Sequence, residues 1–108
     1  MKSHLAMCTY RVKEQKDEEF LAVLLKHAPT LRRLSLLTEE HSRIYRGTDE
    51  SGKSFFVEVL PWKEADGAKL AEQLPDVVAV WEKMGKLVES RMGRPPMEFP
   101  MVEQIDNA

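Results

Sequence analysis

The spacing of hydrophobic and polar residues predicts alternating strands and helices. Between Leu5 and Val12 both alternating sets of side chains are largely apolar, which is typical of a central strand covered on both faces. From Asp17, the predicted N-cap, apolar residues recur every three or four positions and acidic residues fill the first turn, as in an amphipathic helix. Pro29 has no N–H and its ring clashes with the preceding turn. We therefore expect this helix to stop or kink near His27.

The middle of the chain predicts a β-hairpin. Residues 42–47 and 54–60 have the composition of strands, and the second of these runs is the most apolar in the sequence. The polar turn between them has Asp49 early and Gly52 late, which suits a type I turn followed by a glycine in the left-handed conformation. Pro61 ends the second strand because proline cannot donate a hydrogen bond to a neighbouring strand.

The last third predicts a helix and an interrupted strand. A weaker helical segment spans residues 64–74. Residues 76–90 then carry one apolar stripe at helical spacing, and Gly93 with the prolines after it ends that helix. A final strand is expected within residues 97–105, where Pro100 limits it to an edge or a bulged strand.

This order of elements predicts an α+β fold. Strand, helix, hairpin, helix and strand form the split βαβ arrangement, βαββαβ, of ferredoxin-like proteins. Right-handed crossovers place the first and third strands at the centre of the antiparallel sheet, with both helices on one face. The other face is then bare and apolar. Because monomers rarely expose more than a few hundred Å² of contiguous apolar surface, we predict a homodimer whose bare faces pack together.

Length and charge narrow the class of protein without naming a reaction. The chain has 108 residues, which fit a single domain over residues 1–108. Sixteen basic residues against eighteen acidic ones give a net charge of −2, so nucleic acid is not an expected partner. No apolar run approaches the roughly 18 residues of a membrane span, so no membrane partner is expected either.

Cysteine and histidine content restricts the possible chemistry further. Cys8 is the single cysteine, so an internal disulfide is excluded and a cytoplasmic location is the default expectation. Cys8 itself is interpreted as a small, buried, unreactive side chain. The three histidines lie on different elements without the spacing of metal ligands, and no metal site is predicted. We expect His27 to interact with the C-terminal dipole of its helix.

Glu58 is the most informative polar residue, because it lies in the middle of an apolar strand. A buried carboxylate without a partner is costly. A three-residue turn pairs Asp49 with Lys53. That register puts Ile44 opposite Glu58, and Arg46 diagonal to Glu58 on the same face. One interpretation is an Arg46–Glu58 ion pair that stabilises the sheet. The other makes Glu58 a general base or a ligand anchor, with Arg46 as a second weak catalytic candidate.

Aromatic residues supply the candidates for a ligand pocket. Trp62 and Trp81 could stack on a flat aromatic ligand or pack as core. Tyr10 and Tyr45 could hold a phenolic substrate or stabilise an oxyanion, or bury a ring with the hydroxyl at the sheet margin. Alternation along the hairpin separates two faces. Tyr45 shares a wholly apolar face with residues 55, 57 and 59, whereas Arg46, Phe56, Glu58, Leu60 and Trp62 share a mixed face that suits a cavity better.

Several stretches carry a likeness to a known family. Tyr10-Arg11-Val12-Lys13 precedes an acidic helix start, Asp17-Glu18-Glu19-Phe20-Leu21. The hairpin strand ends in a tryptophan, Val57-Glu58-Val59-Leu60-Pro61-Trp62-Lys63, and a spacer with Ala68 and Leu70 leads to Leu74-Pro75-Asp76-Val77. In these features residues 4–105 resemble the antibiotic-biosynthesis-monooxygenase-like (ABM) domains of the dimeric α/β-barrel superfamily.

The resemblance implies a dimeric α/β barrel and offers more than one activity. The family includes oxygenases that use neither metal nor flavin and act on polycyclic phenols, and also haem-degrading oxygenases. The haem-degrading members need an asparagine on the first strand, a tryptophan after the hairpin and a histidine on the last helix. Only Trp62 matches that set, so haem degradation is not expected.

Two functions therefore remain open on the sequence. The first is a cofactor-independent monooxygenase that acts on a small aromatic compound, with Glu58, Arg46, Tyr10 and Trp62 lining the pocket. The second is a non-catalytic dimeric module that binds a small hydrophobic ligand or a protein. The segment over residues 91–100 is not a general mark of the family and has no assigned role.

Overall fold

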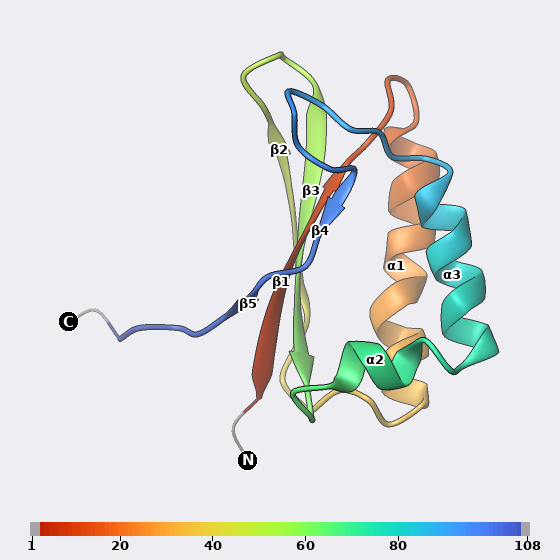
Figure 1. The fold of residues 1–108 in the computed structure, drawn as a ribbon, viewed down its shortest axis with the longest axis vertical. Coiled ribbons are helices and arrows are strands. Elements are labelled where there is room, and N and C mark those ends of the chain that lie inside the picture. The colour runs from red at the N-terminus through yellow and green to blue at the C-terminus, as the bar shows by residue number, and fades with distance from the viewer. Residues whose placement is uncertain (1–2, 107–108) are drawn as a thin grey trace.

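The computed structural model describes residues 3–106, which form one antiparallel sheet with helices on one of its faces (Figure 1). The sheet has the order β2-β3-β1-β4, with β5 also paired to β1. The two central strands are the first and third, which confirms the predicted ferredoxin-like α+β fold. The elements are β1 (His4–Arg11), α1 (Asp17–Arg33), β2 (Arg43–Thr48), β3 (Ser54–Trp62), α2 (Gly67–Ala71), α3 (Pro75–Gly85), β4 (Met97–Glu98) and β5 (Met101–Val102).

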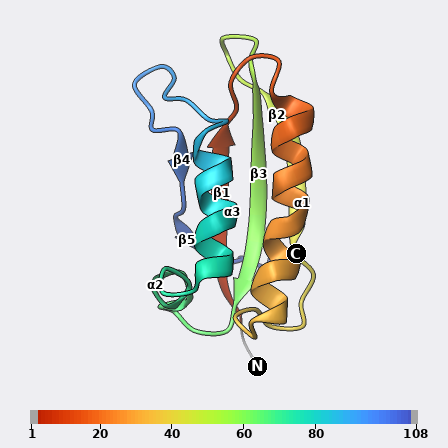
Figure 2. The same ribbon diagram turned by 90° about the vertical axis from the view of Figure 1, so that its right-hand side faces the viewer.

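Alternation along β3 sets which side chains reach the core. Phe56, Glu58, Leu60 and Trp62 are buried on the side of the helices, where α1 and α3 lie side by side across the sheet (Figure 2). The predicted hairpin register is confirmed, with Ile44 opposite Glu58. The other face of the sheet carries no helix. Apolar side chains on that open face remain partly exposed: Leu5, Met7, Tyr45, Phe55, Val57 and Val59.

Helix α1 differs from its prediction at both ends. It begins with Asp17 as its first helical residue rather than its cap, and it continues through Pro29. Pro29 lies on the exposed side, as does Leu25, so water can replace the N–H that the Leu25 carbonyl loses. The helix therefore does not stop near His27, and that part of the expectation was wrong. His27 lies inside the helix, buried against the sheet, and not at the C-terminal dipole.

In the last third of the chain the helix is shorter than predicted, and the residues after it pair with β1 in an extended conformation. Helix α3 ends at Gly85, five residues before the predicted end, because the backbone beyond it pairs with the end of β1. Val88 forms a bridge with Val12, and the Glu89 N–H donates to the Arg11 carbonyl over 2.9 Å. The predicted final strand is present as β4 and β5, separated by Phe99 and Pro100, at the edge position that Pro100 indicated.

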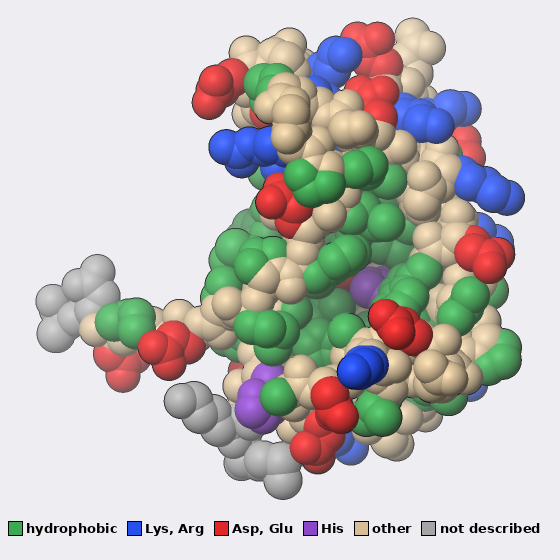
Figure 3. Space-filling view, viewed as in Figure 1, with side chains coloured by type: hydrophobic (Ala, Val, Ile, Leu, Met, Phe, Trp, Pro, Cys, Tyr) green, Lys and Arg blue, Asp and Glu red, His purple; other side chains and the backbone are tan. Residues whose placement is uncertain are grey.

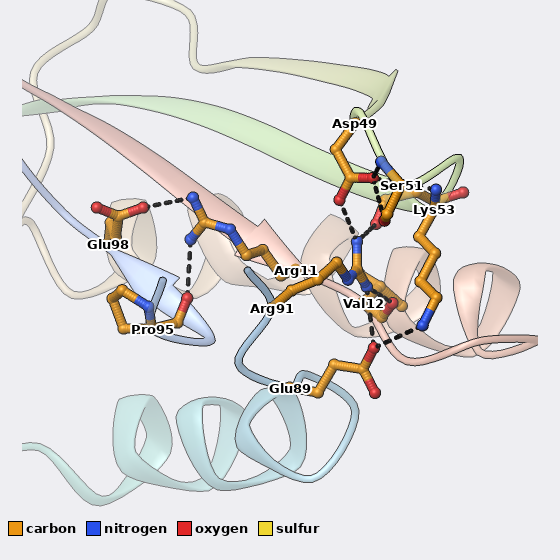
Figure 4. A network of polar contacts seen from close by, with 10 residues as sticks. Arg11, Val12, Asp49, Ser51, Lys53, Glu89, Arg91, Pro95 and Glu98 are labelled. Carbon is orange, nitrogen blue, oxygen red and sulfur yellow. Dashed lines mark hydrogen bonds and ion pairs between the residues drawn. The ribbon is translucent and has the colours of Figure 1, made fainter. Parts of the chain in front are cut away.

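Arg91 anchors the segment over residues 91–100, to which the sequence assigned no role (Figure 4). Its guanidinium lies 2.7 Å from Asp49 in the hairpin turn and donates to the carbonyls of Val12 over 2.5 Å and Ser54 over 3.1 Å. The Ser51 hydroxyl and then Arg91 hold the pKa of Asp49 well below its usual range. The segment therefore ties the hairpin turn to the end of β1.

Arg11 makes a second anchor for the same segment. Its guanidinium donates to the Pro95 carbonyl over 2.8 Å and lies 2.6 Å from the Glu98 carboxylate (Figure 4). These contacts hold the start of β4 against β1.

None of the helices within residues 3–106 is long and apolar enough to cross a membrane.

Candidate functional site

A cavity of about 310 Å³ lies between the sheet and the helices. Figure 3 shows the hollow, bordered mainly by hydrophobic side chains and with a histidine inside it. Phe99 and Met101, on the broken edge of the sheet, supply the outer wall and are about half exposed. Most of the lining side chains are aromatic, sulfur-containing or aliphatic, and two more, His27 and Glu72, are titratable. The full lining is Ala6, Cys8, Tyr10, His27, Leu60, Trp62, Ala68, Glu72, Trp81, Met84, Met97, Phe99 and Met101.

Local packing places Trp62 at the floor of this cavity. Trp62 is the last residue of β3, and its side chain is buried. Gly67, at the start of α2, lies so close that a Cβ atom there would come within 2.4 Å of the indole ring. A glycine is therefore required for α2 to close over Trp62, and Ala68 of the same helix then borders the cavity.

A chain of hydrogen bonds joins three side chains of the cavity wall to the buried Glu58 behind it. The Tyr10 hydroxyl donates to Glu58 Oε1 over 2.8 Å, and His27 Nδ1 lies 2.8 Å from the same oxygen. The indole N–H of Trp81 donates to His27 Nε2 over 2.9 Å. Because an indole N–H can only donate, Nε2 is the unprotonated nitrogen. The imidazole proton is therefore on Nδ1 and is donated to Glu58, so Oε1 accepts two hydrogen bonds.

The Glu58 carboxylate has an unusual environment. The residue has no exposed surface, and within residues 3–106 His27 is the basic side chain that pairs with it. Glu58 Oε2 has no hydrogen-bond partner among the described residues. Leaving a buried carboxylate oxygen unsatisfied costs free energy, and such features concentrate at functional sites.

Two neighbours of Glu58 are held in their protonated forms. Burial, and then the charge of Glu58, raise the pKa of the Cys8 thiol to about 12. The same two causes raise the pKa of the Tyr10 hydroxyl well above its ordinary value. Both groups are therefore neutral donors near pH 7, and Cys8 is not a nucleophile. Its predicted burial is confirmed.

The structure brings together three of the four predicted pocket aromatics. Tyr10, Trp62 and Trp81 line the cavity. Tyr45 does not, since it lies on the open face of the sheet and is about half exposed. Glu58 lies one hydrogen bond behind the wall, joined to it through Tyr10 and His27.

The predicted ion pair between Arg46 and Glu58 is wrong. The Arg46 guanidinium stacks over the Phe56 ring, 5.0 Å from its centroid, and lies 3.5 Å from the carboxylate of Glu18 on α1. It is directed to the surface edge of the sheet, where its charge stays hydrated. Arg46 therefore has no place in the cavity.

His27 is the residue that sequence reasoning missed. It falls on the buried stripe of α1 with Phe20, Leu24 and Leu31, so a polar residue on an apolar face was the available signal. The expected break at Pro29 concealed that signal. Within residues 3–106, no three His, Cys, Asp or Glu side chains are grouped as metal ligands would be.

Comparisons with known proteins agree on the fold. No family model and no curated protein matches the chain. Among solved structures, a candidate antibiotic biosynthesis monooxygenase from Bordetella bronchiseptica superposes with a TM-score of 0.74 at 11% identity, over 97% of this chain and 99% of that one. SnoaB, a cofactor-independent oxygenase from Streptomyces nogalater, gives 0.68 at 14% identity, over 97% of this chain and 96% of that one.

A third structure carries the comparison beyond proteins named as oxygenases. A dimeric protein of unknown function with a ferredoxin-like fold, from Bacteroides fragilis, gives a TM-score of 0.60 at 12% identity, over 93% of this chain and 94% of that one. At such low identities the likeness concerns the backbone and not the site residues. The chain thus has the ferredoxin-like α+β fold of the antibiotic biosynthesis monooxygenase structures.

Proposed function

We propose that this protein binds a small aromatic compound in the cavity and acts on it as a cofactor-independent monooxygenase. The observation that carries the proposal is a cavity of about 310 Å³, large enough for a small molecule, whose wall contains His27 backed by the buried Glu58. Three aromatic rings from separate elements, Tyr10, Trp62 and Trp81, offer stacking surfaces. Apart from His27 and from Glu72 at the exposed rim, the wall is mostly apolar, so the favoured ligand is flat and hydrophobic with few polar groups.

The chemistry proposed for the site begins with loss of a proton from the ligand. A deprotonated phenolic compound is electron-rich enough to react with dioxygen without a metal or flavin. The cavity favours such a step because His27 in its wall is paired with the buried carboxylate of Glu58 behind it. SnoaB, one of the structures with this fold, is named as a cofactor-independent oxygenase, which supports the same reaction class.

The working unit in this proposal is a homodimer. The open face of the sheet carries a strip of partly exposed apolar side chains that includes Met7, Val57 and Tyr45. Past β5, residues 103–106 leave the body of the molecule on the side of that face (Figure 1). The Bacteroides fragilis structure with this fold is described as dimeric. Burying two such faces against each other follows from the free energy of removing apolar area from water.

Oxygen uptake with a panel of anthrone-like phenols tests the proposed activity. The protein is treated with a chelator and is free of flavin, and uptake is expected to rise with both protein and phenol concentration. Quenching of the Trp62 and Trp81 fluorescence by the same compounds measures binding independently of turnover. Binding without uptake would instead support the non-catalytic ligand-binding module. Absence of both signals across the panel would remove the small-aromatic proposal.

A further inference from the structure

We propose that His27 is the proton acceptor of the cavity, that Glu58 positions it, and that Trp81 covers its basic nitrogen until a ligand binds. The inference rests on the proposed function, because it requires a weakly acidic ligand in the cavity. It goes further by assigning the base and a gate. The sequence-based candidate for the base was Glu58, which lies behind the wall rather than in it.

The hydrogen bonds decide which atom takes the proton. Trp81 donates to His27 Nε2, so Nε2 carries no proton of its own, and Nδ1–H is donated to Glu58. His27 borders the cavity, whereas Glu58 does not. A histidine held by a carboxylate at one nitrogen and unprotonated at the other has the geometry of a general base.

Glu58 supplies the reason for the proton to move. In the free protein a carboxylate without exposed surface faces a neutral imidazole, and its second oxygen has no partner among the described residues. Once His27 accepts a proton, the same contact of 2.8 Å becomes an ion pair, which stabilises both groups in a medium of low dielectric constant. The Tyr10 hydroxyl fixes the carboxylate from the other side. Glu58 and Tyr10 are positioning residues in this scheme.

Other groups in the wall are poorer acceptors. The raised pKa values of Tyr10 and Cys8 keep both protonated near pH 7. Glu72 borders the cavity from its exposed rim, where its charge is hydrated. His27 is therefore the lining group that combines burial, an unprotonated nitrogen and a charged partner.

Trp81 acts as the gate because its indole N–H occupies the position that an acidic ligand needs. Trp81 lies on α3, borders the cavity and is only partly buried. A phenolic hydroxyl that replaces the indole N–H at Nε2 keeps that nitrogen hydrogen-bonded. The displaced ring remains available to stack on the ligand.

The step itself is a proton transfer without a change of oxidation state. The O–H bond of the phenol breaks and an N–H bond forms at His27 Nε2. The products are a phenolate in the cavity and an imidazolium that stays hydrogen-bonded to Glu58. Later reaction of the phenolate with dioxygen belongs to the proposed function and is not needed for this step.

The test uses 4-nitrophenol, whose phenolate form absorbs visible light, and ¹⁵N-histidine NMR of the full chain. In the free protein, His27 is expected to carry its proton on Nδ1. At saturation, below the pH at which free 4-nitrophenol ionises, both nitrogens of His27 are expected to be protonated and the phenolate absorbance to appear. A proton on Nε2 in the free protein would refute the inference without any ligand.

Two variants separate the base from the gate. His27→Gln keeps a side chain that can donate to Glu58 but cannot take a proton, so bound 4-nitrophenol is expected to lose at least tenfold of its phenolate signal while tryptophan quenching persists. Trp81→Phe keeps a ring and removes the N–H, and is expected to bind 4-nitrophenol about three- to tenfold more tightly, because no hydrogen bond must be exchanged. Arg46→Gln is the matched control outside the cavity and is expected to leave both signals unchanged.

The outcomes distinguish this inference from the proposed function. If wild-type protein binds 4-nitrophenol while His27 stays singly protonated, the base is assigned wrongly but the ligand site stands. Equal phenolate signals in wild type and His27→Gln would have the same meaning. If no phenol binds at all, both the ligand site and the base are refuted. Should His27→Gln fail to fold, the NMR titration of the wild type and the Trp81→Phe affinity decide the question.

Discussion

The Tyr10 hydroxyl supplies one of the two hydrogen bonds to Glu58 Oε1. Tyr10→Phe keeps the ring packing against Phe20 and removes that bond, which leaves the buried carboxylate with His27 alone. Hydrogen bonds to charged groups contribute about 1.5–3 kcal/mol, so the free energy of unfolding is expected to fall by about that amount. Urea denaturation measures the change.

Tyr45→Phe is the matched control for this substitution. It removes the same hydroxyl from a side chain that is half exposed on the open face. The expected change in the free energy of unfolding is within about 0.5 kcal/mol. Equal effects of the two substitutions would mean that the Tyr10–Glu58 contact contributes nothing particular to stability.

At the scale of single residues, the sequence indicated which positions are unusual but not how they pair. Glu58 stood out because its neighbours in β3 are apolar, and its burial followed from the period of two. Its partner could not be predicted, because Tyr10 and His27 lie 48 and 31 residues away along the chain. Arg46 was close in register, but a long guanidinium side chain stays hydrated more cheaply at an edge.

Helix α1 contains a proline in its interior, and this is a local cost that substitution can remove. Pro29→Ala restores an N–H for the carbonyl of Leu25, a residue on the exposed side of the helix. Proline is about 3 kcal/mol less favourable than alanine inside a helix, and part of that is offset by the greater entropy of the unfolded alanine chain. We therefore expect the free energy of unfolding to rise by about 1–2 kcal/mol in urea denaturation.

Pro75 provides the control within the same chain. It occupies the first turn of α3, where its missing N–H has no helical partner to lose. Pro75→Ala is therefore expected to give no gain in stability. A gain at Pro75 equal to that at Pro29 would show that the effect of Pro29 is not specific to the helix interior.

The contact of Asp49 with Ser51 and Arg91 predicts an acid-sensitive hairpin anchor. The pKa of Asp49 is lowered in the folded protein, so its contribution to stability is present above the unfolded value, near 3.9, and is lost as pH falls toward the folded value. Asp49→Asn is expected to lower the urea midpoint at pH 7. At pH 2 the difference between the two proteins should shrink by more than half.

A control and a contrary outcome accompany the acid experiment. Asp76→Asn alters an exposed carboxylate paired with Arg33, and its effect at pH 7 should be close to zero. If the gap between wild type and Asp49→Asn stays constant from pH 7 to pH 2, the charge of Asp49 is not what holds the anchor.

At the scale of elements, the spacing of apolar residues and the residues of the turns predicted most helices and strands. The hairpin register followed from one left-handed glycine, Gly52, and from the alternation in β3. The ends of α1 and α3 did not follow, because tertiary contacts decide them. Beyond Gly85, Leu87 and Val88 remain buried and Val88 pairs with the end of β1, so an apolar stripe at helical spacing continued where the helix itself did not.

The open sheet face makes a prediction about assembly. Val57 lies near the middle of that face, between Thr9 and Tyr45 on neighbouring strands. Wild-type protein is expected to sediment at about twice the chain mass of 12.4 kDa. Val57→Glu places a charge on the face proposed to pack against a second copy, so this variant is expected to sediment as a monomer at micromolar concentration.

Leu25→Glu serves as the control for assembly. It introduces the same charge at an exposed position on the helix side of the molecule, away from the open face. Its sedimentation should match that of the wild type. A wild-type protein that sediments as a monomer would contradict the predicted dimer and would leave the exposed apolar face unexplained.

For the whole molecule, the order of elements was enough to predict the sheet and the side that carries the helices. Handedness and apolarity of the two central strands leave few arrangements. The mixed face of β3 indicated a cavity but not its size. The volume of the cavity depends on how α2 and the β4–β5 edge close around Trp62. Such distances arise from packing between distant segments, which no local pattern encodes.

The interruption of the edge strand at Phe99 and Pro100 affects how easily the cavity can change the size of ligand that it accepts. Met97, Phe99 and Met101 shape the outer wall, yet the long pairing between β1 and β3 does not depend on them. Larger or smaller side chains at these three positions can therefore resize the chamber at little cost to the scaffold. Substitutions at these three positions would then let the same fold accept ligands of different size during evolution.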